Sequence, residues 1–110
     1  MREDFVRLLQ RAAQKDASDI HIKVNSVPFF RVDGLVEPQE GKPLTPDVVQ
    51  GYLEDLLNEG QMRYFQKTGE VDLAFTEKGV GRFRVNIFRQ RGSVSIVLRR
   101  IKSKILSFEQ

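Results

Sequence analysis

The sequence predicts an α+β domain with a mainly antiparallel sheet of about six strands packed against two to three helices. Helical and strand-like segments do not alternate along the 110 residues in the manner of βαβ units, which argues against a parallel sheet. Several strand-like segments instead follow one another across short turns, as antiparallel strands do. Hydrophobic residues make up 40% of the chain and include eight Phe, which is enough to fill one compact core.

The first part of the chain predicts a helix followed by short strands. Apolar residues recur at helical spacing over 2–15. Apolar and polar residues alternate over 19–25, as in a half-buried strand. A second strand is expected over 29–34, and its final Asp-Gly pair is a typical hairpin turn. We expect this turn to lead into a short third strand at Leu35 and Val36.

A loop and two further helices are expected next. Proline, glycine and charged residues make 37–43 a predicted loop. Thr45 is expected to cap a helix whose first residue is Pro46. A shorter helix is predicted over 60–67, with Gly69 ending it. The predicted buried face of the longer helix consists of Val48, Val49, Tyr52, Leu53, Leu56 and Leu57.

Three strands are predicted in the last third of the chain, over 70–77, 81–91 and 93–100. Facing residues of an antiparallel pair point to the same side of the sheet, so apolar sets should oppose each other. This places Phe75 opposite Phe83, with a three-residue loop between the strands.

The register of the next hairpin follows from a two-residue turn at Arg91-Gly92. That turn places Ile87 opposite Ile96 and Val85 opposite Leu98, and it therefore makes Arg84 face Arg99 on the polar side. Like charges directly opposite each other destabilise a sheet, so we do not expect this pair to serve the fold. Within the sheet, only Asp72 is placed to neutralise part of the charge.

Charge is unevenly distributed along the chain. Residues 1–77 hold nine Lys/Arg against fourteen Asp/Glu, a net charge of −5, whereas residues 78–108 hold nine Lys/Arg and no acid, a net charge of +9. Part of this charge could be answered by ion pairs within the fold. A face on which Arg82, Arg84 and Arg99 converge is also a candidate anion receptor, and guanidinium suits phosphate because it presents a bidentate fork. The alternative is a solvated strand face.

Several classes of function find little support. The chain has no cysteine and one histidine, so no disulfide and no multi-histidine metal site is expected. No apolar run is long enough to span a membrane, and the N-terminus lacks a secretory signal. Phosphate-loop, dinucleotide-binding and zinc-protease motifs are absent. His21 is interpreted as a structural hydrogen-bonding residue and Asp19 as the side-chain cap of a turn.

Four motifs in order resemble the N-terminal domain of PilT/PilU-type ATPases, the motors of type IV pilus retraction and twitching motility in the secretion ATPase superfamily. Residues 17–22 match the family's ASDxH strand opening and residues 31–34 its RVDG turn. Residues 81–86 match its arginine-rich RFRVN strand, and residues 97–101 resemble its closing strand. The likeness covers essentially the whole chain, and it does not separate PilT from PilU or another paralogue.

The resemblance implies a PAS-like domain over 1–102 and, over 103–110, the start of a linker to a RecA-like ATPase domain that this chain lacks. It implies a cytoplasmic homohexamer that works with the pilus machinery at the inner membrane. There the N-terminal domain packs on a neighbouring subunit's RecA-like domain, which binds ATP and Mg²⁺. The arginines that would approach the ATP phosphates are Arg82, Arg84 and Arg99, by arginine-finger logic.

The chain alone is expected to have no enzymatic activity, because it carries no phosphate loop. Five further residues are candidates for interdomain or subunit contacts, namely Asp19, His21, Arg89, Arg91 and Arg100. No nucleic acid, bound metal or membrane insertion is expected. Two alternatives remain open: a nucleic-acid-binding module, favoured by the basic segment, and a ligand-sensing PAS-like domain, which would need a sizeable cavity.

Overall fold

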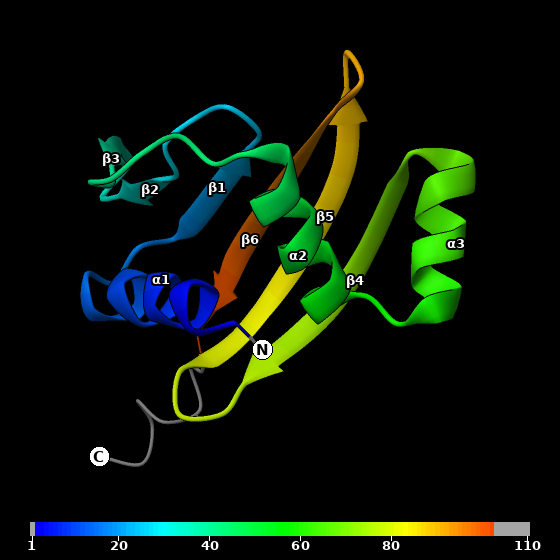
Figure 1. The fold of residues 1–110 in the computed structure, drawn as a ribbon. Helices are drawn as coiled ribbons and strands as arrows, with labels where there is room; N and C mark the ends of the chain where they lie inside the picture. Colours follow the sequence, from blue (N-terminus) through cyan, green and yellow to red (C-terminus); the bar gives the residue numbers. More distant parts are fainter. Residues whose placement is uncertain (1, 103–110) are drawn as a thin grey trace.

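A computed structural model describes residues 2–102, which form three helices and a six-stranded sheet (Figure 1). The α+β class is confirmed. Residues 103–110, the expected start of a linker, lie outside the described residues. The elements are α1 (Glu3–Gln14), β1 (Asp19–Lys23), β2 (Phe29–Val32), β3 (Leu35–Pro38), α2 (Pro46–Leu56), α3 (Glu59–Thr68), β4 (Glu70–Glu77), β5 (Gly81–Gln90) and β6 (Ser93–Ile101).

The strands are arranged in the order β3-β2-β1-β6-β5-β4, and every neighbouring pair is antiparallel. The long hairpin of β5 and β6 lies at the centre, and its turn extends beyond the rest of the sheet (Figure 1). The hairpins β2–β3, β4–β5 and β5–β6 were predicted from the sequence. The pairing of β1 with β6 was not, although it joins the two halves of the sheet.

Helices α1 and α2 lie in front of the sheet in Figure 1, and α3 runs beside β4. The core fills the space between helices and sheet and is continuous from α1 to β4. Its largest fully buried side chains include Phe5, Phe30, Phe65 and Phe83. The other face of the sheet carries no helix in the part of the chain that the structure describes.

The predicted hairpin registers are confirmed. Phe75 faces Phe83, and Ile87 faces Ile96. In the β5–β6 turn, Arg91 and Gly92 both have positive φ, 54° and 80°, which is the geometry of a two-residue hairpin turn. Asp33 and Gly34 also both have positive φ in the β2–β3 turn. The alternation of buried and exposed positions along β5 therefore follows the sequence pattern.

Two local details differ from the prediction. Glu37 and Pro38 belong to β3 instead of the following loop, because Pro38 pairs with Phe29. Proline is tolerated there since β3 is an edge strand. Val48 is half-buried, unlike the rest of the predicted α2 face.

The helix ends are held by side-chain and backbone caps. Thr45 Oγ1 accepts a hydrogen bond from the Val48 amide at 3.3 Å, as expected of an N-cap. Asn58 and Gln61 form a reciprocal capping box at the start of α3, and Gly69 ends that helix with φ of 83°. Within residues 2–102, no helix is long and apolar enough to cross a membrane.

Candidate anion-binding site

The uncovered face of the sheet carries a row of charged residues that crosses four strands. Arg31 on β2 faces Asp19 on β1, Asp19 faces Arg99 on β6, and Arg99 faces Arg84 on β5. All four residues point away from the core, because their neighbours along each strand are the buried apolar ones. The row brings together residues from the first and last thirds of the sequence.

Arg84 and Arg99 are the two receptor candidates that the structure brings together. They stand directly opposite each other, both are exposed, and neither forms an ion pair within residues 2–102. A shallow pocket of about 310 Å³ lies over them, and Asp72, Val85, Asn86 and Val97 complete its lining. Two adjacent guanidinium groups without a carboxylate partner favour an anionic ligand.

Arg82 lies on the same face of β5, two residues before Arg84. It is exposed and stands opposite Thr76 on β4 and Ile101 on β6. Its side chain does not line the pocket over the other two arginines.

The side-chain amide of Asn86 forms hydrogen bonds with two acidic residues of β4 near the arginine pair. Asn86 Nδ2 donates hydrogen bonds to Asp72 Oδ1 at 2.8 Å and to Glu70 Oε2 at 3.0 Å. Asp72 lies diagonally from Arg84 on the neighbouring strand, as expected, but within residues 2–102 it hydrogen-bonds the Asn86 amide and forms no ion pair with Arg84. Asp72 keeps its negative charge and lines the same pocket, so it offsets part of the positive charge of the arginine pair without pairing with either arginine.

Asp19 is a buried charged residue, and its surroundings differ from the expected turn cap. Its Oδ2 lies 3.4 Å from His21 Nε2 and 3.7 Å from Arg31 Nε. The His21 ring stacks on Phe29 with centroids 4.5 Å apart. The neighbouring Ser18 does not cap that turn either, because its hydroxyl donates to the carbonyl of Arg31 on β2. The turn-cap interpretation of Asp19 is wrong, whereas the structural role of His21 agrees with these contacts.

Arg31 was missed as a site residue. The sequence shows it only as part of the RVDG turn, and its place in the charged row depends on the pairing of β1 with β2. No local signal in the sequence places it near Arg99.

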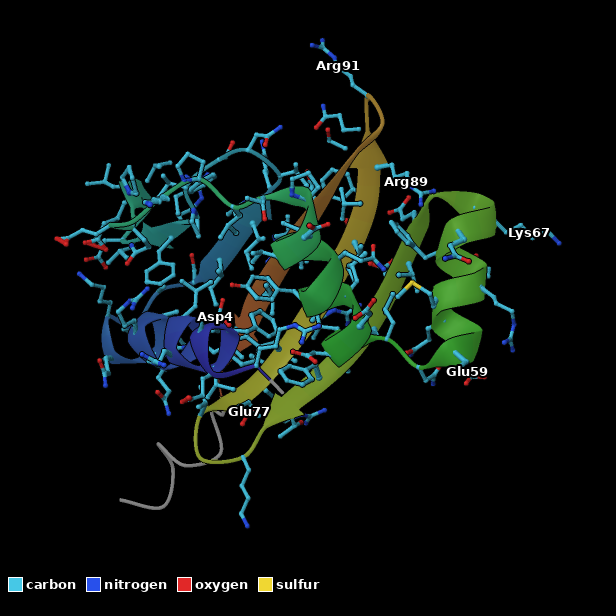
Figure 2. All side chains as sticks on the ribbon, viewed as in Figure 1. Asp4, Glu59, Lys67, Glu77, Arg89 and Arg91 are labelled. Atoms are coloured by element: carbon cyan, nitrogen blue, oxygen red, sulfur yellow. The ribbon has the colours of Figure 1, made fainter. Side chains whose placement is uncertain are left out.

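The three remaining arginines of the hairpin have other surroundings. The Arg89 guanidinium lies 4.7 Å from the centroid of the Phe65 ring. Arg100 Nη1 donates to Asp16 Oδ1 at 3.1 Å and to the Ala17 carbonyl at 2.8 Å. Arg91 extends from the hairpin tip (Figure 2). Hydrogen bonds from Lys102 and then from Arg100 hold the pKa of Asp16 below its ordinary value.

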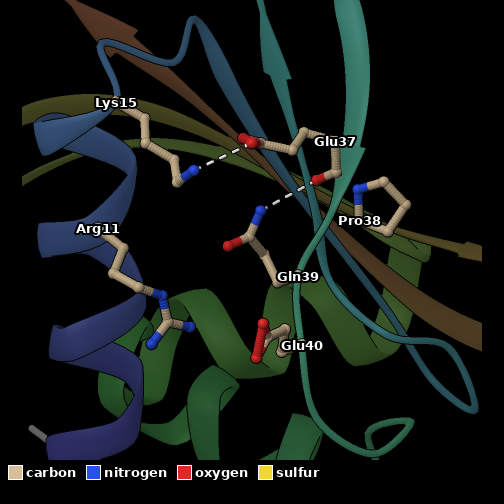
Figure 3. Close-up of a pocket in the computed structure, with 6 residues that line it drawn as sticks. All are labelled: Arg11, Lys15, Glu37, Pro38, Gln39 and Glu40. Carbon is tan, nitrogen blue, oxygen red and sulfur yellow. Dashed lines mark hydrogen bonds and ion pairs between the residues drawn. The ribbon is translucent and has the colours of Figure 1, made fainter.

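A second pocket, of about 390 Å³, lies between α1 and β3 (Figure 3). Arg11 and Lys15 line it from the helix, and Glu37 and Glu40 line it from the strand and the loop after it. Lys15 Nζ pairs with Glu37 Oε1 at 3.0 Å. Because its cations and anions are mixed, this pocket is a weaker anion receptor than the Arg84–Arg99 pocket. Within the described residues, no three His, Cys, Asp or Glu side chains are grouped to hold a metal ion.

The chain is similar to two ATPases of Pseudomonas aeruginosa. It is 36% identical over 107 residues to the type IV pilus ATPase PilU, covering 97% of this chain and 28% of that protein. It is 37% identical over 107 residues to the type IV pilus retraction ATPase PilT, covering 97% and 31%. The chain thus spans less than a third of the length of these relatives. No protein-family model matches it.

Solved structures of such ATPases also match this chain. The crystal structure of the pilus retraction motor PilT with bound ADP matches with a TM-score of 0.81 and 34% identity, over 90% of this chain and 29% of that one. The ATPase DotB of Legionella pneumophila matches with a TM-score of 0.74 over 100% of this chain and 33% of that one. Its 20% identity shows a shared fold alone.

Proposed function

This chain is the N-terminal domain of a PilT/PilU-type ATPase, and on that premise we propose that its arginines stabilise charge on the phosphates of ATP held by a RecA-like domain. The observation that carries the proposal is the Arg84–Arg99 pair. Two exposed guanidinium groups face each other on an uncovered sheet face, with no carboxylate bound to them within residues 2–102.

The cost of this pair to the fold supports a functional role. Directly opposed like charges in a sheet are destabilising. A phosphate group placed between the two side chains would relieve the repulsion and accept hydrogen bonds from both. An arginine aimed at a transferring phosphoryl group stabilises the negative charge that develops there.

In this proposal the RecA-like domain binds ATP with Mg²⁺, and the present domain supplies only cations. Movement between the two domains would bring Arg84 and Arg99, with Arg82 beside them, toward the phosphates or away from them. Turnover would thereby be linked to domain position, which is how the motor would produce mechanical work. The chain alone is predicted not to hydrolyse ATP.

The assembly in this proposal is a homohexamer at the cytoplasmic face of the inner membrane, working with the pilus machinery. Each N-terminal domain would pack on a neighbouring subunit's RecA-like domain. Of the candidate contact residues, Arg91 is the best placed, because it extends from the hairpin tip (Figure 2). Arg89, Arg100, Asp19 and His21 already have partners within the chain, so substituting them tests the fold as well.

Steady-state ATPase assays test the proposal on a protein that joins this domain to its RecA-like domain. Arg84→Ala should lower kcat about 100-fold while the melting temperature stays close to that of the parent. Arg63→Ala is the matched control, since Arg63 is an exposed arginine on α3 whose contact is with Glu59. Full activity of Arg84→Ala, or an equal loss in Arg63→Ala, would contradict the proposal.

A further inference from the structure

Arg99 has opposite charges on its two flanks. The same position of β6 faces Arg84 on β5 and Asp19 on β1. Side chains that are directly opposite in an antiparallel pair are close enough to interact. Arg99 is exposed and lines the pocket, so its side chain can approach either neighbour.

Asp19 retains the capacity to accept another hydrogen bond. Its contacts with Arg31 and His21 both involve Oδ2 and are long, at 3.7 Å and 3.4 Å. No residue within 2–102 donates a hydrogen bond to its Oδ1. The carboxylate is 13% exposed, so an added charge-assisted bond would be poorly screened by solvent.

We propose that Asp19 acts as an internal substitute for the phosphate, competing with it for the Arg99 guanidinium. Asp19 and Arg99 form no ion pair within residues 2–102, but when no anion is bound, repulsion from Arg84 and attraction to Asp19 favour movement of the Arg99 side chain toward β1. When a phosphate enters, it attracts both arginines, and Arg99 turns to the pocket. Asp19 is therefore a positioning residue that sets how readily Arg99 is released. This inference rests on the proposed phosphate-binding role of the arginine pair.

The predicted sign of the effect separates this role from a structural one. If Asp19 only supported the sheet, its replacement would weaken binding or leave it unchanged. If it competes with phosphate, removing its charge strengthens binding. His21 and Arg31 keep another partner in either case, because the His21 ring stacks on Phe29 and Arg31 Nη1 donates a hydrogen bond to the Gly34 carbonyl at 3.2 Å.

The test uses the present chain, Asp19→Asn, and inorganic tripolyphosphate as the probe at low ionic strength. We expect the affinity to rise about two- to fivefold, the range of a partly exposed ion pair. Asp47→Asn is the matched control: it makes the same change in net charge in the first turn of α2, away from the row. No gain in Asp19→Asn, or an equal gain in Asp47→Asn, would overturn the inference.

A second pair of variants tests whether the effect passes through Arg99. In an Arg99→Gln background, Asp19→Asn should give no further gain in affinity. A gain that persists there contradicts the competition. Amide spectra and melting temperatures of all variants check that the fold is retained.

A ligand-free measurement distinguishes failure of this inference from failure of the proposed function. Asp19→Asn should shift the NMR signal of the Arg99 Nε–Hε group and change its exchange with water. If the parent chain binds no tripolyphosphate but this signal shifts, the anion role fails and the proposed interaction of Asp19 with Arg99 stands. If the signal is unchanged, the inference fails whatever the binding result.

Discussion

Arginines of the same hairpin have different surroundings because strand residues alternate between the two faces of the sheet. Arg84 and Arg99 point to the uncovered face and face each other. Arg89 and Arg100 point to the helix side, where one contacts the Phe65 ring and the other binds Asp16. Opposite effects on stability should follow from replacing members of the two sets.

We expect Arg84→Gln to raise the free energy of unfolding by about 0.2–0.5 kcal/mol, because it removes a repulsive cross-strand pair. Arg100→Gln should lower it by about 1 kcal/mol, since it removes hydrogen bonds to Asp16 and to the Ala17 carbonyl. Urea unfolding of the two variants measures both effects. A loss of stability in Arg84→Gln as large as in Arg100→Gln would contradict the view that Arg84 belongs to a repulsive pair and Arg100 to a stabilising contact.

Asp16 is expected to make stability depend on pH. Its pKa in the folded chain is lowered by hydrogen bonds from Lys102 and Arg100, relative to its ordinary value of 3.8. A lowered folded pKa stabilises the fold above the unfolded value, and the stabilisation is lost as the pH falls through the folded pKa. An NMR titration of the Asp16 carboxyl should show this shift, and Lys102→Gln should move the pKa back up.

At the scale of elements, α3 illustrates how local signals specify a helix. Asn58 and Gln61 close its first turn, and Gly69 ends it in the left-handed conformation. Its Phe65 is fully buried beside β4, so the helix depends on tertiary packing as well as on its caps. Two glycines lie near its ends, and only Gly69 has a positive φ whereas Gly60 does not.

Gly69→Ala should lower the free energy of unfolding by about 1 kcal/mol, because φ of 83° is unfavourable for a residue with a Cβ. Gly60→Ala is the matched control within α3, and it should be neutral or stabilising by up to about 1 kcal/mol. The nearest atom to an added Cβ there is Asn58 Oδ1 at 3.6 Å, an ordinary contact. Equal effects of the two substitutions in thermal unfolding would refute this account of the helix end.

At the scale of the whole molecule, the sequence predicts what depends on neighbouring residues and misses what depends on distant strands. Hairpin turns and apolar alternation predict the Arg84–Arg99 pair, because both strands belong to one hairpin. The position of Asp19 beside Arg99 requires β1 to pair with β6, which are separated by most of the chain. Nothing local in the sequence specifies that pairing, so the charged row could not be predicted in full.

The whole domain has a continuous core on one face of its sheet and an arginine pair on the other. In the proposed motor, the core keeps the domain rigid while the uncovered face meets the nucleotide. The isolated chain should therefore contact phosphates weakly and hydrolyse nothing. Phosphate release from ATP above background in the purified chain would contradict this division of roles.

Phosphate binding by Arg84 and Arg99 is tested most directly by following the arginine side chains of this chain by NMR during titration with ATP. We predict saturable shifts of the Arg84 and Arg99 Nε–Hε signals, with little change at the control residue Arg63. Inorganic tripolyphosphate should produce the same pattern, because the phosphates carry the interaction. Small, unsaturated shifts spread over all exposed arginines would contradict the claim that the open sheet face holds a phosphate-binding pair.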